Sequence, residues 1–185
     1  MRIAVVSDSH GSWREAEQAL AALKPLDLLL FAGDYYRDPW RWAQREKVRV
    51  AAVIGNCDWG ARGPEEELLE LGGTRILLTH GHRYGAKWGL ERLFFRGLEA
   101  GVKAVVFGHT HVPVATYGEG GLLLFNPGSP SHPRGGNGGS IGLLEVERGL
   151  ITPRLYKIDE LKARRAGQSA AKIHFDDRDE MSYNI

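Results

Sequence analysis

The sequence predicts a mixed α/β domain, and two observations carry that prediction. In the first half, short apolar runs alternate with segments of helical periodicity, which is typical of parallel strands linked by helices. In the second half, apolar runs are joined by tight Gly-rich turns, which predict hairpins and antiparallel pairing. We therefore expect either two sheets or one large mixed sheet. The 185 residues, 43% of them apolar, suffice for one domain with its own core.

The first half contains three predicted strands and two helices. The strands are buried apolar runs at residues 3–7, 28–32 and 48–54. Ser12 and Glu15 have the spacing of a capping box at the start of a helix that Pro25 ends. A second, shorter helix is expected over Trp40 to Lys47.

Hairpins dominate the remainder of the chain. They are expected over residues 67–79, 112–125 and 141–158, and a helix and the strand 104–107 lie between the first two. The helix presents Leu90, Leu93, Phe94 and Leu98 on one face. We place the domain at residues 1–160, followed by a C-terminal tail at 161–185 with a helical turn and a loosely held end.

Composition limits the chemistry. With 24 basic and 23 acidic residues the net charge is +1, which gives no electrostatic reason for tight nucleic-acid or membrane binding. One cysteine excludes an intramolecular disulfide and a Cys-built zinc site, so any metal must use His, Asp, Glu or Asn. The apolar runs are too short for a signal peptide or a membrane span, so we expect a soluble, cytoplasmic protein.

Polar side chains gather where the predicted strands end. The segments are Asp8-Ser9-His10, Gly33-Asp34, Gly55-Asn56-Cys57-Asp58, Thr79-His80-Gly81-His82, Gly108-His109-Thr110-His111 and Asn126-Pro127-Gly128-Ser129. Loops at the carboxyl ends of parallel strands converge, so these carboxylates, amides and imidazoles should meet in one cleft. Such a donor set suits a transition metal, and the glycines permit close backbone approach. The alternative is that these residues only cap helices and turns.

Taken together, the motifs resemble those of the calcineurin-like metallophosphoesterase superfamily, in particular its YfcE-like small phosphodiesterase branch. The resemblance covers Arg2 to about Ile158 and implies a four-layer α/β/β/α sandwich of two mixed sheets flanked by helices. It also implies two divalent metal ions, among which we expect Mn²⁺, with Ni²⁺, Fe, Zn²⁺ and Mg²⁺ as alternatives. The implied reaction is hydrolysis of a phosphodiester by a hydroxide that bridges the metals.

Carried over residue by residue, the resemblance assigns seven metal ligands. The first-metal group is Asp8, His10 and His111, the second-metal group is Asn56, His80 and His109, and Asp34 bridges the two metals. Asp34 and Asn56 thereby also belong to the catalytic set.

Three further candidates have weaker support. Cys57 stands where many relatives have a histidine, and a thiol is a poorer proton donor at neutral pH, so we expect activated aryl diesters to be better substrates than alkyl ones. Cys57 is otherwise a small buried filler. Asp58 either orients His10 or a ligand water, or it is a turn residue. His82 either supports the ligands or faces the substrate, or it is a solvated loop residue.

Other features invite a functional interpretation. His132 and Arg134 could line the cleft, although an arginine there more often faces solvent. Tyr35 and Tyr36 either flank the substrate or pack the loop. Basic residues around Trp40 and Trp42 could bind single-stranded nucleic acid, but a solvated helix face is the more common explanation. The tryptophans could also belong to an interface, because the resemblance allows a homodimer or homotetramer.

The leading hypothesis is thus a phosphodiesterase that acts on a small phosphodiester. A phosphomonoesterase is the nearest alternative, because monoesters and diesters differ by one charge. A non-catalytic scaffold of the retromer-subunit type is a second alternative, against which the full set of seven ligands argues. A nuclease is less favoured, because the chain shows no added DNA-binding segment.

Overall fold

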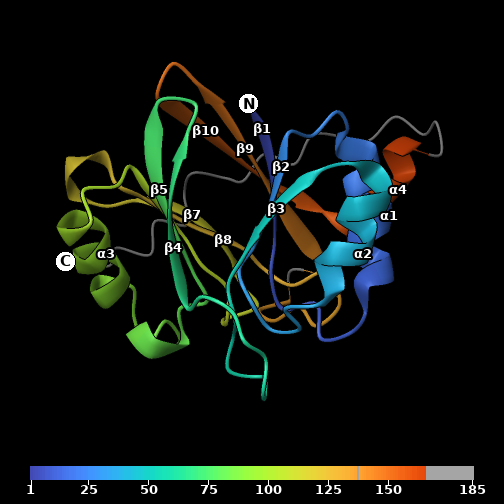
Figure 1. The fold of residues 1–185 in the computed structure, drawn as a ribbon, viewed down its shortest axis with the longest axis horizontal. Coiled ribbons are helices and arrows are strands. Elements are labelled where there is room, and N and C mark those ends of the chain that lie inside the picture. The colour runs from blue at the N-terminus through green and yellow to red at the C-terminus, as the bar shows by residue number, and fades with distance from the viewer. Residues whose placement is uncertain (137, 166–185) are drawn as a thin grey trace.

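The computed structural model describes residues 1–136 and 138–165, and it contains two five-stranded sheets packed face to face (Figure 1). The prediction of a four-layer α/β/β/α sandwich is confirmed. The hairpins left open two sheets or one large mixed sheet, and the chain forms two sheets. Of the tail predicted at residues 161–185, residues 161–165 belong to a helix and the rest lie outside the described residues. None of the helices within the described residues combines the length and the apolarity needed to cross a membrane.

The first sheet has the strand order β10-β9-β1-β2-β3. Its three first-half strands are parallel, and the last hairpin pairs antiparallel with β1. The bounds are β1 Arg2–Val6, β2 Leu28–Phe31, β3 Arg49–Ala52, β9 Ser140–Glu147 and β10 Leu150–Lys157.

The second sheet has the order β4-β5-β6-β8-β7. Its three central strands are parallel, and β4 and β7 are antiparallel edges. The bounds are β4 Glu66–Leu71, β5 Thr74–Thr79, β6 Ala104–Val106, β7 Pro113–Tyr117 and β8 Leu123–Pro127. Each sheet therefore has parallel strands whose carboxyl ends lie on the same side.

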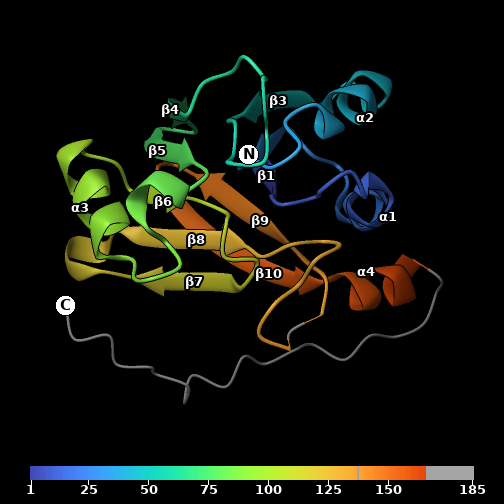
Figure 2. The same ribbon diagram turned by 90° about the horizontal axis from the view of Figure 1, so that it is seen from below.

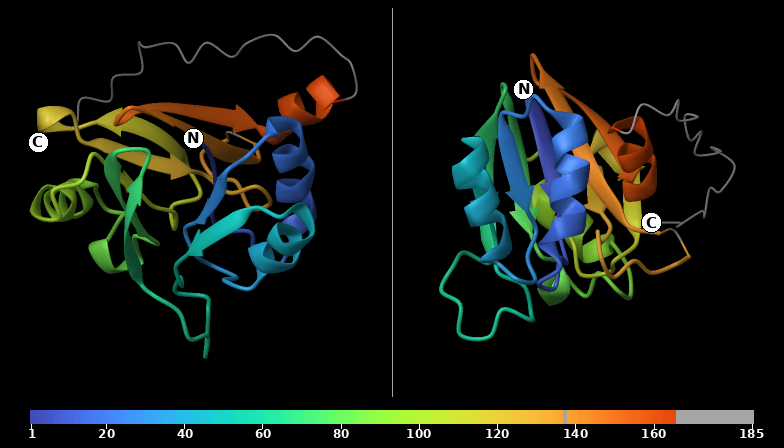
Figure 3. Two further views of the ribbon diagram at one scale, coloured as in Figure 1. Left: turned by 45° about the horizontal axis from the view of Figure 1, so that its top comes forward. Right: turned by 90° about the vertical axis from the view of Figure 1, so that its right-hand side faces the viewer.

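Helices cover the outer faces. Seen from below, α3 lies on one side of the molecule and α1, α2 and α4 lie on the other (Figure 2), and Figure 3 shows α4 beside α1. The bounds are α1 Trp13–Leu23, α2 Asp38–Glu46, α3 Glu91–Glu99 and α4 Ile158–Arg165, with short 3-10 turns η1 at His82–Tyr84 and η2 at Glu119–Gly121.

Three apolar layers hold the sandwich together. The central layer lies between the sheets and includes Val5, Leu30, Ile76 and Phe125. A second layer packs the first sheet against α1, α2 and α4, and a third packs the second sheet against α3. Because both of their faces are covered, the inner strands β2 and β6 are fully buried apolar runs, whereas the edge strand β10 alternates exposed with partly buried residues.

Two local predictions differ from the structure. Ser12 precedes α1, but its side chain makes no cap hydrogen bond, because its ψ of 61° departs from the extended geometry of an N-cap. The second helix begins at Asp38 rather than Trp40, because Pro39 fits the first turn of a helix, where its missing N–H is not needed.

Candidate metal centre

The loops after the parallel strands of both sheets meet at one edge of the sandwich. Asp8 is fully buried at the end of β1, and its two carboxylate oxygens accept the backbone N–H of His109 at 2.9 and 3.2 Å. One of these oxygens lies 3.3 Å from Nε2 of His111, which in turn lies 3.2 Å from Nε2 of His10. The first-metal group is thus assembled from the β1 and β6 loops.

Asp34 connects this group to the second one. Its Oδ2 lies 3.7 Å from Nε2 of His10, and its Oδ1 lies 3.4 Å from Nε2 of His80. Donor atoms of Asp8, His10, Asp34 and His111 all lie within 4.8 Å of one another. One carboxylate therefore presents an oxygen to each of the two predicted groups.

The second-metal group surrounds His80. Its Nε2 lies 3.1 Å from Oδ1 of Asn56, and its ring centroid is 5.1 Å from that of His109. These residues come from the loops after β5, β3 and β6, so both sheets contribute. All seven residues that the sequence predicts as ligands are consequently brought together in one place.

Two buried histidines have a fixed orientation. Nδ1 of His80 donates to the carbonyl of Ala32 at 2.6 Å, and Nδ1 of His111 donates to that of His132 at 2.6 Å. A carbonyl only accepts, so the proton must sit on Nδ1, and the Nε2 lone pair faces the centre. This is how proteins orient histidines that ligate metals, so the residues present fit a bound divalent metal.

The backbone at the centre is strained. Among the described residues, eight non-glycine residues have positive φ, and five of these are Asp8, His10, Asp34, His109 and His111. Side chains other than glycine seldom adopt this conformation, and its concentration in one place is typical of a functional site. Gly33 shows the crowding, because a Cβ there would come within 2.7 Å of Nδ1 of His80.

Asp58 ties two of the loops together. Its Oδ2 accepts the N–H of Gly55 at 2.8 Å and of Asp34 at 3.1 Å, and its Oδ1 accepts the N–H of Tyr36 at 2.7 Å. The carboxylate thus acts on the backbone around Asp34. The sequence predicts that Asp58 either orients His10 or a ligand water, or is a turn residue. In the structure, Asp58 links two loops.

The loop that contains Asn126 and Ser129 supports the loops that follow β1 and β6. The sequence did not reveal this role. Asn126 is buried, donates to the carbonyl of Gly108 at 2.8 Å and accepts the N–H of Gly128 at 2.8 Å. The Ser129 hydroxyl donates to the carbonyl of Asp8 at 2.8 Å and accepts the N–H of His132 at 2.8 Å. These contacts fix the β1 and β6 loops relative to each other.

Burial and neighbouring charges both shift the pKa values of the cluster. Burial, and then the charge of His80, lower the pKa of His109 to about 4. Burial also lowers the pKa of His111, but the hydrogen bond and charge of Asp8 outweigh it, so the net shift is upward. For Asp8, burial raises the pKa, but His111 and His80 hold it below its usual value.

Cys57 and His82 lie beside the ligands. The Cys57 N–H donates to Oδ1 of Asp34 at 2.8 Å, and burial followed by the nearby Asp34 raises the pKa of the thiol to about 11. The ring of His82 is 5.3 Å from that of His80, and its buried Nδ1 has no hydrogen-bond partner among the described residues. His82 packs against the ligands and is not among the described residues that line the cleft.

An open cleft of about 640 Å³ leads to the centre. His132 and Arg134 line it, as the sequence allowed, and so do Tyr35 and Lys87. Lys87 was not predicted, since it belongs to no motif; the only signal was its place in the loop that follows His80. The cleft is thus rimmed by cations and leads to buried carboxylates.

The basic and aromatic run on α2 has a structural explanation. Trp42 is buried against α1 and the first sheet, whereas Trp40 is partly exposed and packs edge-to-face on Tyr36. Arg45 forms ion pairs with Glu17 and Glu46. These contacts favour the solvated helix face over a nucleic-acid surface.

Comparison with known proteins agrees with this geometry. The calcineurin-like phosphoesterase superfamily domain matches residues 1–149. The chain is 34% identical over 157 residues to the probable metallophosphoesterase YsnB of Bacillus subtilis, covering 84% of this chain and 90% of that one. It is 33% identical over 170 residues to the phosphodiesterase YfcE of Escherichia coli, covering 78% and 88%.

Solved structures show the same fold. A predicted phosphoesterase from Streptococcus pneumoniae matches with a TM-score of 0.71 at 30% identity, over 85% of this chain and 90% of that one. Vps29 of Entamoeba histolytica, solved with zinc, shares the fold alone, at 20% identity. From its domain match and its relatives, the chain belongs to the calcineurin-like phosphoesterase superfamily and resembles the YfcE-type members.

Proposed function

We propose that this protein is a metal-dependent phosphodiesterase with a dinuclear centre formed by the two metal groups and bridged by Asp34. The observation that carries the proposal is the Asp34 carboxylate, with one oxygen toward His10 and the other toward His80. Two divalent ions bound there would lower the pKa of a water between them and stabilise charge on the phosphoryl oxygens.

The protein's own residues then have distinct tasks. His80 and His111 are held with Nε2 free to bind a cation, because each donates its one N–H, on Nδ1, to a backbone carbonyl. Lys87 and Arg134 on the rim attract an anionic phosphate into the cleft. Asp58 and His82 act as positioning residues, Asp58 through the backbone of Asp34 and His82 by packing beside His80.

Cys57 limits the range of leaving groups under this proposal. A thiol, whose ordinary pKa is about 8.5, is a weaker acid than an imidazolium, so it assists the departure of an alkoxide less at neutral pH. Aryl diesters, whose leaving groups need no proton, should therefore be turned over better than alkyl diesters. Exchange of Cys57 for histidine should raise the rate on alkyl diesters more than on aryl ones, and an equal effect on both would contradict a role in proton donation.

A matrix of metals and substrates tests the activity. Bis-p-nitrophenyl phosphate, p-nitrophenyl phosphate and cyclic nucleotides are each assayed with Mn²⁺, Ni²⁺, Fe²⁺, Zn²⁺ and Mg²⁺, with His109→Ala as the control. We expect metal-dependent hydrolysis, fastest on the diester with Mn²⁺, that His109→Ala abolishes. Faster hydrolysis of the monoester would indicate a phosphomonoesterase, and no turnover anywhere would favour the scaffold function.

A cytoplasmic location and assembly into a homodimer or homotetramer accompany the proposal. Sedimentation of the purified chain measures the assembly, and a monomer at micromolar concentration would contradict it.

A further inference from the structure

A second hollow of about 360 Å³ adjoins the metal cleft. Tyr35 and Cys57 line both hollows and so form the boundary between them. Trp59, Arg37 and Asp38 line the second hollow only. A group attached to a phosphate in the metal cleft would therefore reach this hollow directly.

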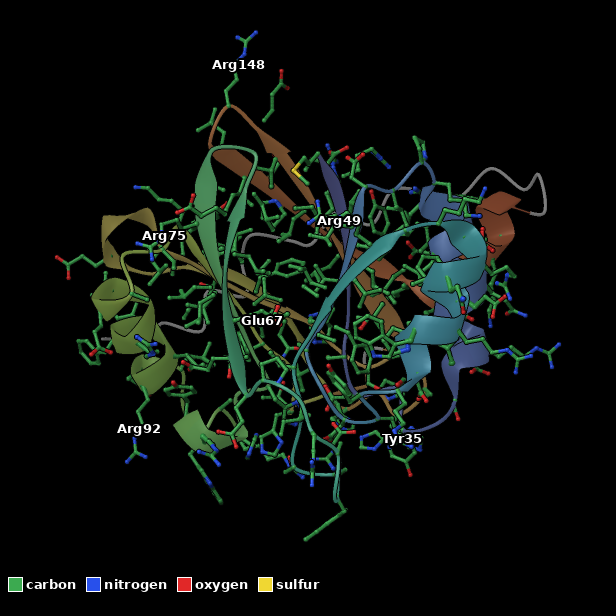
Figure 4. All side chains as sticks on the ribbon, in the orientation of Figure 1. Tyr35, Arg49, Glu67, Arg75, Arg92 and Arg148 are labelled. Atoms are coloured by element: carbon green, nitrogen blue, oxygen red, sulfur yellow. The ribbon has the colours of Figure 1, made fainter. Side chains whose placement is uncertain are left out.

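The second hollow has exposed aromatic walls. The Trp59 side chain is 91% exposed and Tyr35 is 45% exposed, although large aromatic residues normally bury most of their surface. Tyr35 is held at a positive φ of 76°, and its ring packs edge-to-face on that of His10 with centroids 5.7 Å apart. Figure 4 shows Tyr35 at the lower edge of the molecule, on the side where the loops of the centre gather. The aromatic ring of Tyr35 thus stands beside the first-metal group.

Polar groups complete the hollow. Oδ2 of Asp38 accepts the Ser9 hydroxyl at 2.7 Å and the Gly11 N–H at 3.1 Å, while its other oxygen accepts no hydrogen bond from the described part of the chain. The exposed guanidinium of Arg37 makes no ion pair with any described residue. The carboxylate of Asp38 thus offers a free acceptor, and the guanidinium of Arg37 offers free donors, at the edge of the aromatic walls. This combination suits a planar ring that carries both N–H and carbonyl or ring-nitrogen groups.

We propose that this hollow binds the nucleobase of a nucleotide whose phosphate lies in the metal cleft, so that the substrate is recognised by its base as well as by its phosphate. The inference rests on the proposed function for the position of the phosphate. The base stacks on Trp59 and Tyr35 and places an N–H against Asp38. A small nucleotide rather than a long polymer is the expected ligand, because a net charge of +1 gives no overall attraction to a polyanion.

Calorimetric titration of the Mn²⁺-loaded full chain tests this. The ligands are the non-hydrolysable 5′-phosphonate analogues of adenosine monophosphate and of ribose 5-phosphate, which differ only by the base. Stacking of one base should make the adenosine analogue bind about tenfold more tightly. Trp59→Ala should reduce this ratio to less than about threefold, whereas Trp59→Phe should retain most of it.

Trp88→Ala is the matched control. Trp88 is 95% exposed, like Trp59, but does not line either hollow, so the ratio should stay as in the wild type. Equal affinities for the two analogues in the wild type, failure of the adenosine analogue to bind, or a ratio unchanged by Trp59→Ala would each overturn the inference. Hydrolysis of bis-p-nitrophenyl phosphate by the same preparations separates the two proposals. A base preference without hydrolysis would contradict the proposed phosphodiesterase activity. Hydrolysis without a base preference would contradict only the proposed nucleobase site.

Discussion

Cys57, the single cysteine of the sequence, follows the predicted metal ligand Asn56 directly. Burial and the neighbouring Asp34 raise the pKa of its thiol to about 11, so the thiolate is scarce at neutral pH. We expect the metal-free protein to react with iodoacetamide at pH 7.5 at least tenfold more slowly than an ordinary cysteine, whose pKa is about 8.5. The rate should rise steadily up to about pH 11. A plateau near pH 8.5 would show an unperturbed thiol.

Asp58 shows that one side chain can set the position of a whole loop. Its carboxylate accepts three backbone N–H groups, from Gly55, Asp34 and Tyr36, and Asp58→Ala leaves them without that partner. We expect a loss of about 1–3 kcal/mol in the free energy of unfolding of the metal-free protein, measured by urea denaturation.

The control for that substitution is Asp159→Ala, an exposed carboxylate on α4, which should change stability by less than about 0.5 kcal/mol. Equal losses in the two variants would mean that the hydrogen bonds of Asp58 add nothing specific.

At the scale of elements, the two sheets approach closely where β9 faces β8. Gly142 lies opposite Phe125, and a Cβ at Gly142 would come within 2.5 Å of the phenyl ring. Phe125 is fully buried, so Gly142→Ala should destabilise the protein by about 1–3 kcal/mol through overpacking. Phe125→Leu should relieve the clash, so the double variant should lose less stability than the sum of the single ones. Additive losses in urea denaturation would contradict this packing.

The strands and loops also show which features can be predicted from the sequence and which cannot. Asp8 and His10, and likewise His109 and His111, follow apolar runs directly, so their place at strand ends could be read from local order alone. The division into two sheets could not, because residues 141–158 form the same hairpin whether they pair with β1 or with β8. The role of Asp58 and the cleft position of Lys87 depend on contacts between loops far apart in sequence, which no local pattern encodes.

At the scale of the whole molecule, metal binding should stabilise the fold, because loops from both sheets supply the ligands. Mn²⁺ should raise the melting temperature and a chelator should reverse the rise. The rise should shrink as the pH falls, because protons compete with the metal for the histidines. This competition begins at His111, whose pKa is raised, whereas His109 stays neutral down to about pH 4. A rise in melting temperature that is equal at pH 8 and pH 5.5 would contradict histidine ligation.

The central claim is that Asp34 bridges two catalytic metal ions. Metal content by mass spectrometry, measured together with the rate on bis-p-nitrophenyl phosphate, tests it in the wild type and in Asp34→Asn. We predict two ions per wild-type chain, and for Asp34→Asn a lower metal content with a rate reduced on the order of a hundredfold. Near-normal metal content together with a near-normal rate in Asp34→Asn would contradict the account.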